Sequence, residues 1–318
     1  MVWPKQSDKL DIPSYQPLIH IGYHKTATTW LQERLFIDPL GYVPVMSHAE
    51  VSQHIVSPNG LKFDKGSAPA LIAQRVADIS EGRIPIISSE ILCGNPFYGG
   101  RESDVFANRL KMSFPNAKIF ISIREQHRML VSLYMQYLSR GGTLTCERFF
   151  LCAPEIGYYR FSPQHLEFHR LIEYYIQLFG KQNVCVLTQE QLAGDMQSYV
   201  EALASFSGNT CFAKTSGPKK EHVGVGHPEG VAGLLRLSNF LLSGPVRNDG
   251  VVIKRKIGNL AYRSVGRLSR VPVLLSLAKK HRKVSEFVAE NFTGAFSESN
   301  AILRTHIPEN EAWLSTYE

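Results

Sequence analysis

The sequence predicts an α/β protein in which a central parallel sheet is flanked by helices, with a mainly helical C-terminal part. Two observations predict this fold class: short apolar runs with the length of buried strands, and helix-period segments that separate them. Long spacings between strands are typical of parallel sheets, because each crossover contains a helix. The expected strands are Leu18–Gly22, Ile84–Ser88, Lys118–Ile123 and Asn183–Leu187, with a further short strand near Tyr42–Val45.

The expected helices alternate with these strands along the chain. They cover Thr29–Phe36, Pro69–Ile79, Ser103–Ser113, Glu125–Leu138 and His165–Phe179, the last ending before Gly180. Three polar residues, Lys25, Glu90 and Arg124, follow the ends of three different strands. Ligands of such sheets bind beyond the carboxyl ends of the strands, so we expect these three side chains to face one site.

The second half of the chain raises a question of domain organisation. A segment rich in glycine and proline, TSGPKKEHVGVGHPEG, covers residues 215–230, and the pattern after it is largely helical. A boundary near residue 230 and a helical appendage to one domain explain this equally well. We expect a single domain over residues 1–318, with an α/β core over 15–230 and a helical extension over 231–318.

The composition is that of an ordinary globular protein, with 44% hydrophobic and 20% charged residues. No apolar run approaches the roughly 18–20 residues that a membrane span needs, and the N-terminus lacks the apolar region of a secretory signal. The five cysteines are scattered and form no C-x-x-C pair. We therefore expect a cytoplasmic protein with reduced thiols and no metal site.

The formal net charge of +7 is unevenly distributed. Between Val251 and Ser285 the sequence has ten basic residues and no acidic residue. This segment is either a solvated helix face or a surface for an anionic substrate or an anionic membrane. No nucleic-acid-binding module accompanies the charge, so nucleic acid is not an expected partner.

The segment LIHIGYHKTATTWLQ, residues 18–32, is the most informative of the chain. An apolar strand ends at Gly22, and a helix is expected to begin a few residues later. The first N–H groups of a helix have no internal partner, so such a junction binds anions, to which Lys25 adds a charge. Thr26, Thr28 and Thr29 add three hydroxyl donors to the N–H groups and to Lys25. A nucleoside-triphosphate loop differs, because it has a second glycine directly before its lysine.

Two motifs resemble those of sulfotransferases that use 3′-phosphoadenylyl sulfate (PAPS). The run IGYHKTATTWLQ is similar to their 5′-phosphosulfate loop, K-T-G-T-T followed by L-Q, with Ala27 in place of the usual glycine. Downstream, Arg124 and Ser132 have the spacing of the arginine and serine that hold the 3′-phosphate in this family. Tyr134 and Gln136 extend the second match. Arginine suits this role because its planar guanidinium can bind phosphate through two hydrogen bonds.

The resemblance implies a three-layer, P-loop-like fold, PAPS as co-substrate, PAP as product and no metal. It implies that the loop residues bind the 5′ end of the cofactor: His24, Lys25, Thr26, Ala27, Thr28 and Thr29. It also suggests that the 215–230 segment closes over the cofactor, with Lys219 and Lys220 as further ligands.

Under the same resemblance, a sulfuryl group passes to a hydroxyl or amine of an acceptor such as a glycan, a lipid or a small molecule. Lys25 is then expected to stabilise charge on the leaving phosphate. Glu90 is our first candidate for the general base that takes the acceptor's proton. His24, His48 and His54 are rival candidates.

Two other functions remain open at this point. A P-loop kinase acting on a small molecule would need a magnesium-binding carboxylate, and it would favour the glycine–lysine–hydroxyl loop that this sequence lacks. A non-catalytic protein that binds anions or glycans on a sulfotransferase scaffold is the second alternative. The presence of Lys25, Glu90, Arg124 and Ser132 together favours an enzyme over this alternative.

Overall fold

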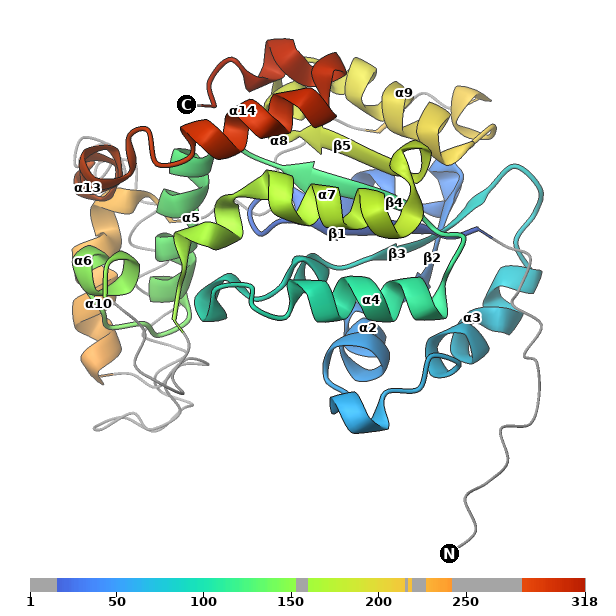
Figure 1. Ribbon diagram of the computed structural model, residues 1–318, viewed down its shortest axis with the longest axis horizontal. Helices are drawn as coiled ribbons and strands as arrows, with labels where there is room; N and C mark the ends of the chain where they lie inside the picture. The colour runs from blue at the N-terminus through green and yellow to red at the C-terminus, as the bar shows by residue number, and fades with distance from the viewer. Residues whose placement is uncertain (1–15, 153–159, 215–216, 219–226, 242–281, 318) are drawn as a thin grey trace, which may run out of the picture.

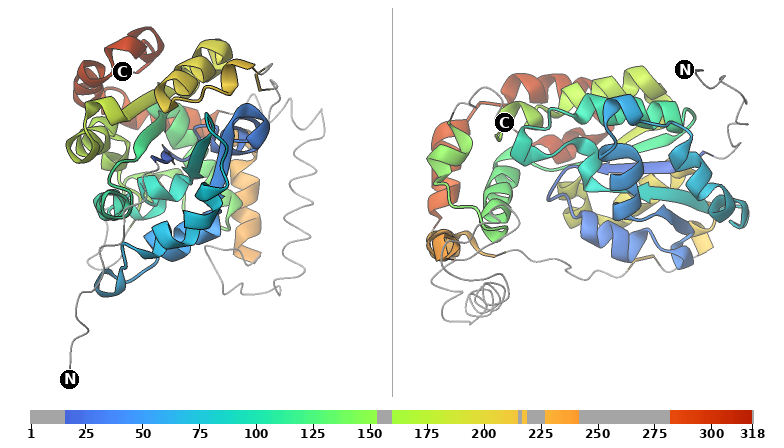
Figure 2. Two further views of the ribbon diagram at one scale, coloured as in Figure 1. Left: turned by 90° about the vertical axis from the view of Figure 1, so that its right-hand side faces the viewer. Right: turned by 90° about the horizontal axis from the view of Figure 1, so that it is seen from below.

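The structure is a computed structural model that describes residues 16–152, 160–214, 217–218, 227–241 and 282–317. Its centre is a sheet of five parallel strands in the order β2-β3-β1-β4-β5, flanked by helices on both sides (Figures 1 and 2), which confirms the predicted fold class. The strands are β1 Leu18–Gly22, β2 Tyr42–Met46, β3 Ile84–Ser88, β4 Lys118–Ile123 and β5 Val184–Thr188.

Strand β1 occupies the middle of the sheet, and all five of its residues are buried. A strand covered on both faces needs a continuous apolar run, which explains the pattern that predicted it. In the register, His20 of β1 lies opposite Ser88 of β3 on one side and Phe120 of β4 on the other. Pro44, which has no N–H to donate, lies in the edge strand β2, where a proline is tolerated.

The helices of the described chain follow in order along the sequence. They are α1 Thr28–Trp30, α2 His48–Val51, α3 Ser67–Ala77, α4 Ser103–Ser113, α5 Gln126–Ser139, α6 Cys146–Phe150, α7 Phe168–Phe179, α8 Gln189–Gly194, α9 Met196–Ser207, α10 Ala232–Leu241, α13 Lys283–Phe292 and α14 Ser297–His306. None of the helices in this part of the chain combines the length and the apolar character needed to cross a bilayer.

Two hydrophobic clusters, one on each face of the sheet, make up the core. Ile19 and Ile21 of β1 belong to the larger cluster, together with buried residues of α4, α5 and α7. Leu18 of β1 and Phe120 of β4 belong to the smaller cluster, which includes buried residues of α9. Alternate residues of one strand therefore pack into different layers, as the period of two in a β-strand requires.

Two predicted helices differ clearly from the observed ones. The helix expected over Thr29–Phe36 is the short α1 followed by a π-helical turn, Leu31–Leu35. The helix expected from His165 begins at Phe168, because Glu167 has a non-helical ψ of 74°. His165 therefore lies in a separate 3₁₀ turn, Pro163–Leu166.

The helices of the predicted C-terminal extension pack against the α/β core. Helices α10 and α13 contact α5, and α14 contacts α7 (Figure 1). The extent of a single domain over residues 1–318 stays a prediction, because 1–15 and 242–281 lie outside the described residues. Most of the basic segment 251–285 lies there too.

A candidate anion site at the carboxyl edge of the sheet

A cavity of about 720 Å³ lies beyond the carboxyl ends of β1, β3 and β4. This is the place where open parallel sheets bind their ligands. The sequence-predicted residues that line it are His24, Lys25, Ala27, Thr28, Thr29, Glu90, Arg124 and Ser132. The structure therefore brings together residues from three strand ends and from α5. Thr26 does not line the cavity, and Lys219 and Lys220 lie outside the described residues.

The loop between β1 and α1 has an unusual backbone. Lys25 and Ala27, with φ of 70° and 60°, are the only non-glycine residues with positive φ in the described chain. This left-handed conformation costs a residue with a Cβ roughly 1–2 kcal/mol, and such strain persists where the surroundings enforce it. Ala27 is also the N-cap residue of α1, and no side chain caps this helix. The first N–H groups of α1 thus have no side-chain acceptor from their cap.

The Lys25 side chain lies in a strongly positive environment. Burial is the main cause that lowers the pKa of its ammonium group, and the positive charges of Arg140 and Arg124 lower it further. The carboxylate of Glu90 acts in the opposite direction and raises this pKa. An anion that enters the cavity would offset the unfavourable burial and repulsion, so the site is suited to a negatively charged ligand.

Arg124 connects the loop to helix α5. Its Nη1 donates a hydrogen bond of 3.1 Å to Ser132 Oγ and one of 3.3 Å to the backbone oxygen of Lys25. The two residues that the second motif singled out are therefore in direct contact. Burial lowers the pKa of Arg124, but a guanidinium remains charged in proteins. The pair presents a cation and a hydroxyl to the cavity, as a phosphate group needs.

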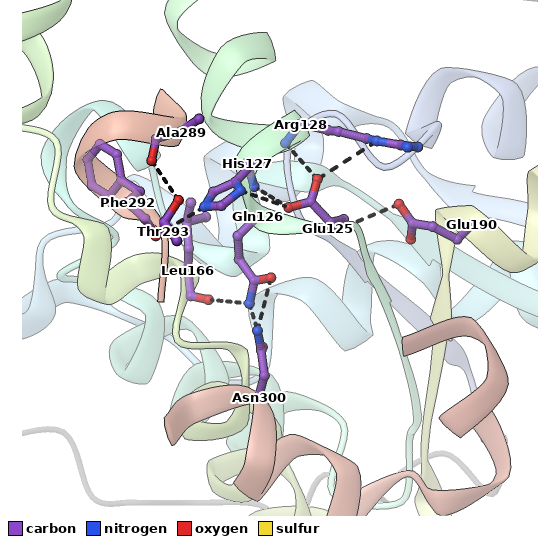
Figure 3. A network of polar contacts seen from close by, with 10 residues as sticks. All are labelled: Glu125, Gln126, His127, Arg128, Leu166, Glu190, Ala289, Phe292, Thr293 and Asn300. Atoms are coloured by element: carbon purple, nitrogen blue, oxygen red, sulfur yellow. Dashed lines mark hydrogen bonds and ion pairs between the residues drawn. The ribbon is translucent and has the colours of Figure 1, made fainter. Parts of the chain in front are cut away.

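A network of polar contacts fixes the start of α5 (Figure 3), which directly follows Arg124 and Glu125 in the sequence. The Glu125 carboxylate caps the helix, because it accepts hydrogen bonds from the backbone N–H groups of His127 at 2.6 Å and Arg128 at 2.9 Å. Glu190 of α8 in turn accepts a hydrogen bond of 3.2 Å from the backbone N–H of Glu125. Both interactions satisfy N–H groups that have no partner within the helix.

The same network reaches the C-terminal helices. Gln126 donates a hydrogen bond of 2.6 Å to Asn300 of α14, and His127 Nε2 donates one of 3.0 Å to the backbone oxygen of Phe292 in α13 (Figure 3). Gln126 and Asn300 are both buried. The position of α5 at the cavity therefore depends on residues more than a hundred positions away in the sequence.

Glu90 and the rival bases differ in their surroundings. Glu90 begins a 3₁₀ turn directly after β3, and its Oε2 lies 3.9 Å from Nδ1 of His48. His48 does not line the cavity, and its Nδ1 also lies 2.8 Å from Ser89 Oγ. His24 does line the cavity, but burial lowers its pKa to about 3, so it is neutral and a weak base at pH 7. His54 lies elsewhere and contacts Ser67 of α3.

The cavity is also lined by polar residues for which the sequence predicts no binding role, among them Gln136, Arg140 and Gln189. Gln136 and Arg140 follow Ser132 by four and eight positions on α5 and at its end, which places all three on one helix face. Gln189 begins α8. The side-chain oxygens of Gln136 and Gln189 are buried and have no hydrogen-bond partner among the residues that the structure describes. Gln136 is already part of the second motif match, and the same four-residue spacing is the signal that could have revealed Arg140.

The described residues contain no group of three or more His, Cys, Asp or Glu side chains arranged to hold a metal ion.

The charged side chains of the cavity include Arg140, which is exposed. Its positive charge lowers the pKa of both Lys25 and His24. Among the described residues, the lysine and arginine side chains that line the cavity are Lys25, Arg124 and Arg140, and the acidic ones are Glu90 and Glu229. Glu229 accepts hydrogen bonds from the backbone N–H and the hydroxyl of Ser285.

Comparisons with known proteins give structural but no sequence similarity. No family model and no curated protein sequence matches the chain. A sulfotransferase from Alicyclobacillus acidocaldarius has a TM-score of 0.48 and 17% identity, covering 79% of this chain and 99% of its own. The sulfotransferase domain from the curacin biosynthetic pathway has a TM-score of 0.40 and 12% identity, covering 88% and 98%.

A third solved structure, of mouse sulfotransferase SULT7A1 complexed with PAP, has a TM-score of 0.32 and 13% identity, covering 87% of this chain and 89% of its own. All three TM-scores are below 0.5, and the identities do not exceed 17%. Similarities at this level do not assign an activity. A function for this chain must therefore be supported by its own motifs and by the geometry of the cavity.

Proposed function

We propose that this chain is a sulfotransferase that moves a sulfuryl group from PAPS to a hydroxyl or amine of an acceptor and releases PAP. One observation carries the proposal: Lys25 and the Arg124–Ser132 pair, which match the two cofactor motifs of this enzyme class, line the same cavity. PAPS has anionic groups at both its 5′ and 3′ positions. The loop suits the 5′-phosphosulfate, and Arg124 with Ser132 suits the 3′-phosphate.

The proposed reaction is an in-line displacement at sulfur. The acceptor oxygen or nitrogen forms a bond to sulfur while the bond between sulfur and the bridging phosphate oxygen breaks, and PAP leaves with that electron pair. Lys25 donates a hydrogen bond to the bridging oxygen as negative charge develops there. Glu90 accepts the proton that the acceptor loses. The remaining contribution is the alignment of the two reactants in the cavity.

The acceptor is expected beyond Lys25, on the side away from Arg124. Arg140 and Gln136 line the cavity along α5 and contribute a cation and a side-chain amide there. A glycan, a lipid headgroup or a small molecule would each fit such a surface. The basic residues between 251 and 285 are a further candidate surface for an anionic acceptor or membrane.

Calorimetry with nucleotides tests the proposal without knowledge of the acceptor. In buffer with EDTA, PAP should bind tightly, and ATP and adenosine 5′-phosphosulfate should bind poorly because they lack the 3′-phosphate. Tight ATP binding that requires magnesium would instead support a small-molecule kinase.

Turnover distinguishes an enzyme from a binding protein. Incubation with PAPS labelled at sulfur and a panel of glycans, phenols and lipid headgroups should transfer the label to at least one acceptor class. Tight PAP binding with no transfer and no PAPS hydrolysis would favour the non-catalytic, anion-binding alternative.

A further inference from the structure

A continuous line of hydrogen bonds runs beneath the Lys25 loop, on the side away from the cavity. Thr26, which does not line the cavity, donates from its hydroxyl to the backbone oxygen of Tyr23 at 2.6 Å. Its Oγ1 also lies 2.7 Å from Ser122 Oγ at the end of β4. Ser122 Oγ in turn lies 3.0 Å from Nε2 of His20 in β1. His20, Thr26 and Ser122 are each at most 1% exposed.

The line continues on the other side of His20 to the helical segment after the loop. Nδ1 of His20 lies 2.8 Å from Ser88 Oγ in β3. Gln32, in the π-helical turn that follows α1, donates from its side-chain amide to Ser88 Oγ at 3.1 Å. The network therefore begins at the loop, crosses three neighbouring strands and returns to the helical segment that the loop precedes.

The donor and acceptor of each hydrogen bond in this line can be deduced in turn, starting from the backbone oxygen of Tyr23. A backbone oxygen can only accept, so the single hydroxyl proton of Thr26 points to Tyr23. Thr26 must then accept from the hydroxyl of Ser122, and Ser122 must accept from an N–H of His20. Nε2 of His20 consequently carries the proton, and its Nδ1 accepts from the hydroxyl of Ser88. The amide of Gln32 completes the line as the donor to Ser88.

The surroundings of His20 agree with a neutral ring. The imidazole stacks on Phe120 with ring centroids 4.8 Å apart and meets the edge of Phe36 at 5.3 Å. Burial lowers its pKa to about 3. Gly22 leaves room for the ring, since a Cβ on this glycine would lie 2.9 Å from His20 Nε2. The same Cβ would lie even closer to the Thr28 methyl group, so a larger residue at this position would force Thr28 or His20 to shift.

We propose that His20 is a positioning residue for the cofactor loop: through Ser122, its Nε2–H group holds Thr26 beneath the loop. Thr26 lies between Lys25 and Ala27, the two residues with strained left-handed backbones. Fixing the side chain between them keeps both in the conformation that directs the loop toward the anion. This role rests on the proposed function, because it concerns the binding of PAP.

The first experiment compares two buried serines by calorimetry with PAP. Ser122→Ala removes the link between His20 and Thr26, and Ser207→Ala removes a buried hydroxyl that contacts Tyr42 and the Ala204 oxygen in another part of the core. Thermal unfolding will verify that both variants fold. We expect Ser122→Ala to weaken PAP binding about tenfold, the effect of losing one to two hydrogen bonds, and Ser207→Ala to leave it unchanged.

The second experiment replaces the histidine itself. His20→Gln retains an N–H donor near the position of Nε2, whereas His20→Leu retains only volume. We expect His20→Gln to bind PAP within about threefold of the wild type and His20→Leu to lose about tenfold. Nitrogen NMR of the imidazole at pH 7, which needs no nucleotide, should show the Nε2–H tautomer.

The outcomes separate this inference from the proposed function. If the wild type does not bind PAP, the proposed function fails and the positioning role fails with it. If the wild type binds PAP but Ser122→Ala and His20→Leu bind it equally well, only the positioning role is overturned. An Nδ1–H tautomer would also overturn it, because Nε2 could then not donate to Ser122.

Discussion

The Lys25 loop and the start of α5 lie at the same edge of the sheet, but different interactions hold them in place. The loop has two strained backbone conformations and rests on buried side chains of the strands beneath it. The start of α5, beside Arg124, has a capped helix end and contacts with α8, α13 and α14 (Figure 3). We expect substitution of Lys25 in the loop to lower turnover most, and substitution of Arg124 at the other end to lower nucleotide affinity most.

The largest expected effect is on turnover, at Glu90. Glu90→Gln keeps the size of the side chain but removes the base, so kcat should fall by about 10²–10⁴-fold while PAP affinity is retained. Steady-state assays with an accepted substrate and PAP calorimetry measure the two quantities. His48→Ala and His54→Ala are the matched tests of the rival bases. A nearly active Glu90→Gln variant beside an inactive histidine variant would transfer the role of base to that histidine.

Lys25 tests the loop end of the comparison directly. Lys25→Ala should lower kcat by roughly 10²–10³-fold, because charge on the leaving phosphate is then unopposed. PAP affinity should change less than kcat does. Lys62→Ala, which removes an exposed lysine that does not line the cavity, is the control for loss of one positive charge. A kcat within threefold of the wild type would contradict the role given to Lys25.

Substitution of Arg124 tests the other end of the cavity and should change the affinity for PAP. Arg124→Ala removes charge-assisted hydrogen bonds and should weaken PAP binding by about 2–3 kcal/mol, or roughly 30–150-fold. Binding of adenosine 5′-phosphosulfate, which lacks the 3′-phosphate, should not respond to this change. Arg128→Ala is the matched control, since Arg128 is one helical turn away, exposed and outside the cavity. An equal loss of affinity for the two nucleotides would show that Arg124 does not bind the 3′-phosphate.

The sequence predicted which residues meet, but not how they are held. Lys25, Glu90 and Arg124 each follow a buried parallel strand, and the carboxyl ends of such strands share one edge, so their proximity follows from topology. Their roles in catalysis and binding stay predictions. The loop motif could not reveal that the Thr26 side chain faces the core, because the sequence does not specify the direction in which a side chain points.

Long-range contacts could not be predicted from the sequence either. The hydrogen bond between Gln126 and Asn300 joins residues 174 positions apart, and no local pattern predicts such a pairing. The predicted lid residues Lys219 and Lys220 lie outside the described residues, so closure of that segment stays a prediction. Limited proteolysis with and without PAP addresses it directly.

The smallest expected effect concerns the strain in the loop itself. Ala27→Gly places the residue typical of the motif at a φ of 60°, where a Cβ costs roughly 1–2 kcal/mol. Glycine also gains about 0.4–1 kcal/mol of freedom in the unfolded chain, which offsets the relief of strain only in part. We expect the free energy of unfolding to rise by roughly 0–1.6 kcal/mol, measured by urea denaturation.

A matched control distinguishes strain relief from a general effect of glycine. Ala73 is exposed in the middle of α3, where the backbone is helical, so Ala73→Gly should destabilise the protein by about 1 kcal/mol. The two substitutions are chemically identical and should therefore differ in sign. If Ala27→Gly destabilises the protein as much as Ala73→Gly does, Ala27 is not strained. The loop would then need no support from the strands beneath it, and the contrast between the two ends of the cavity would disappear.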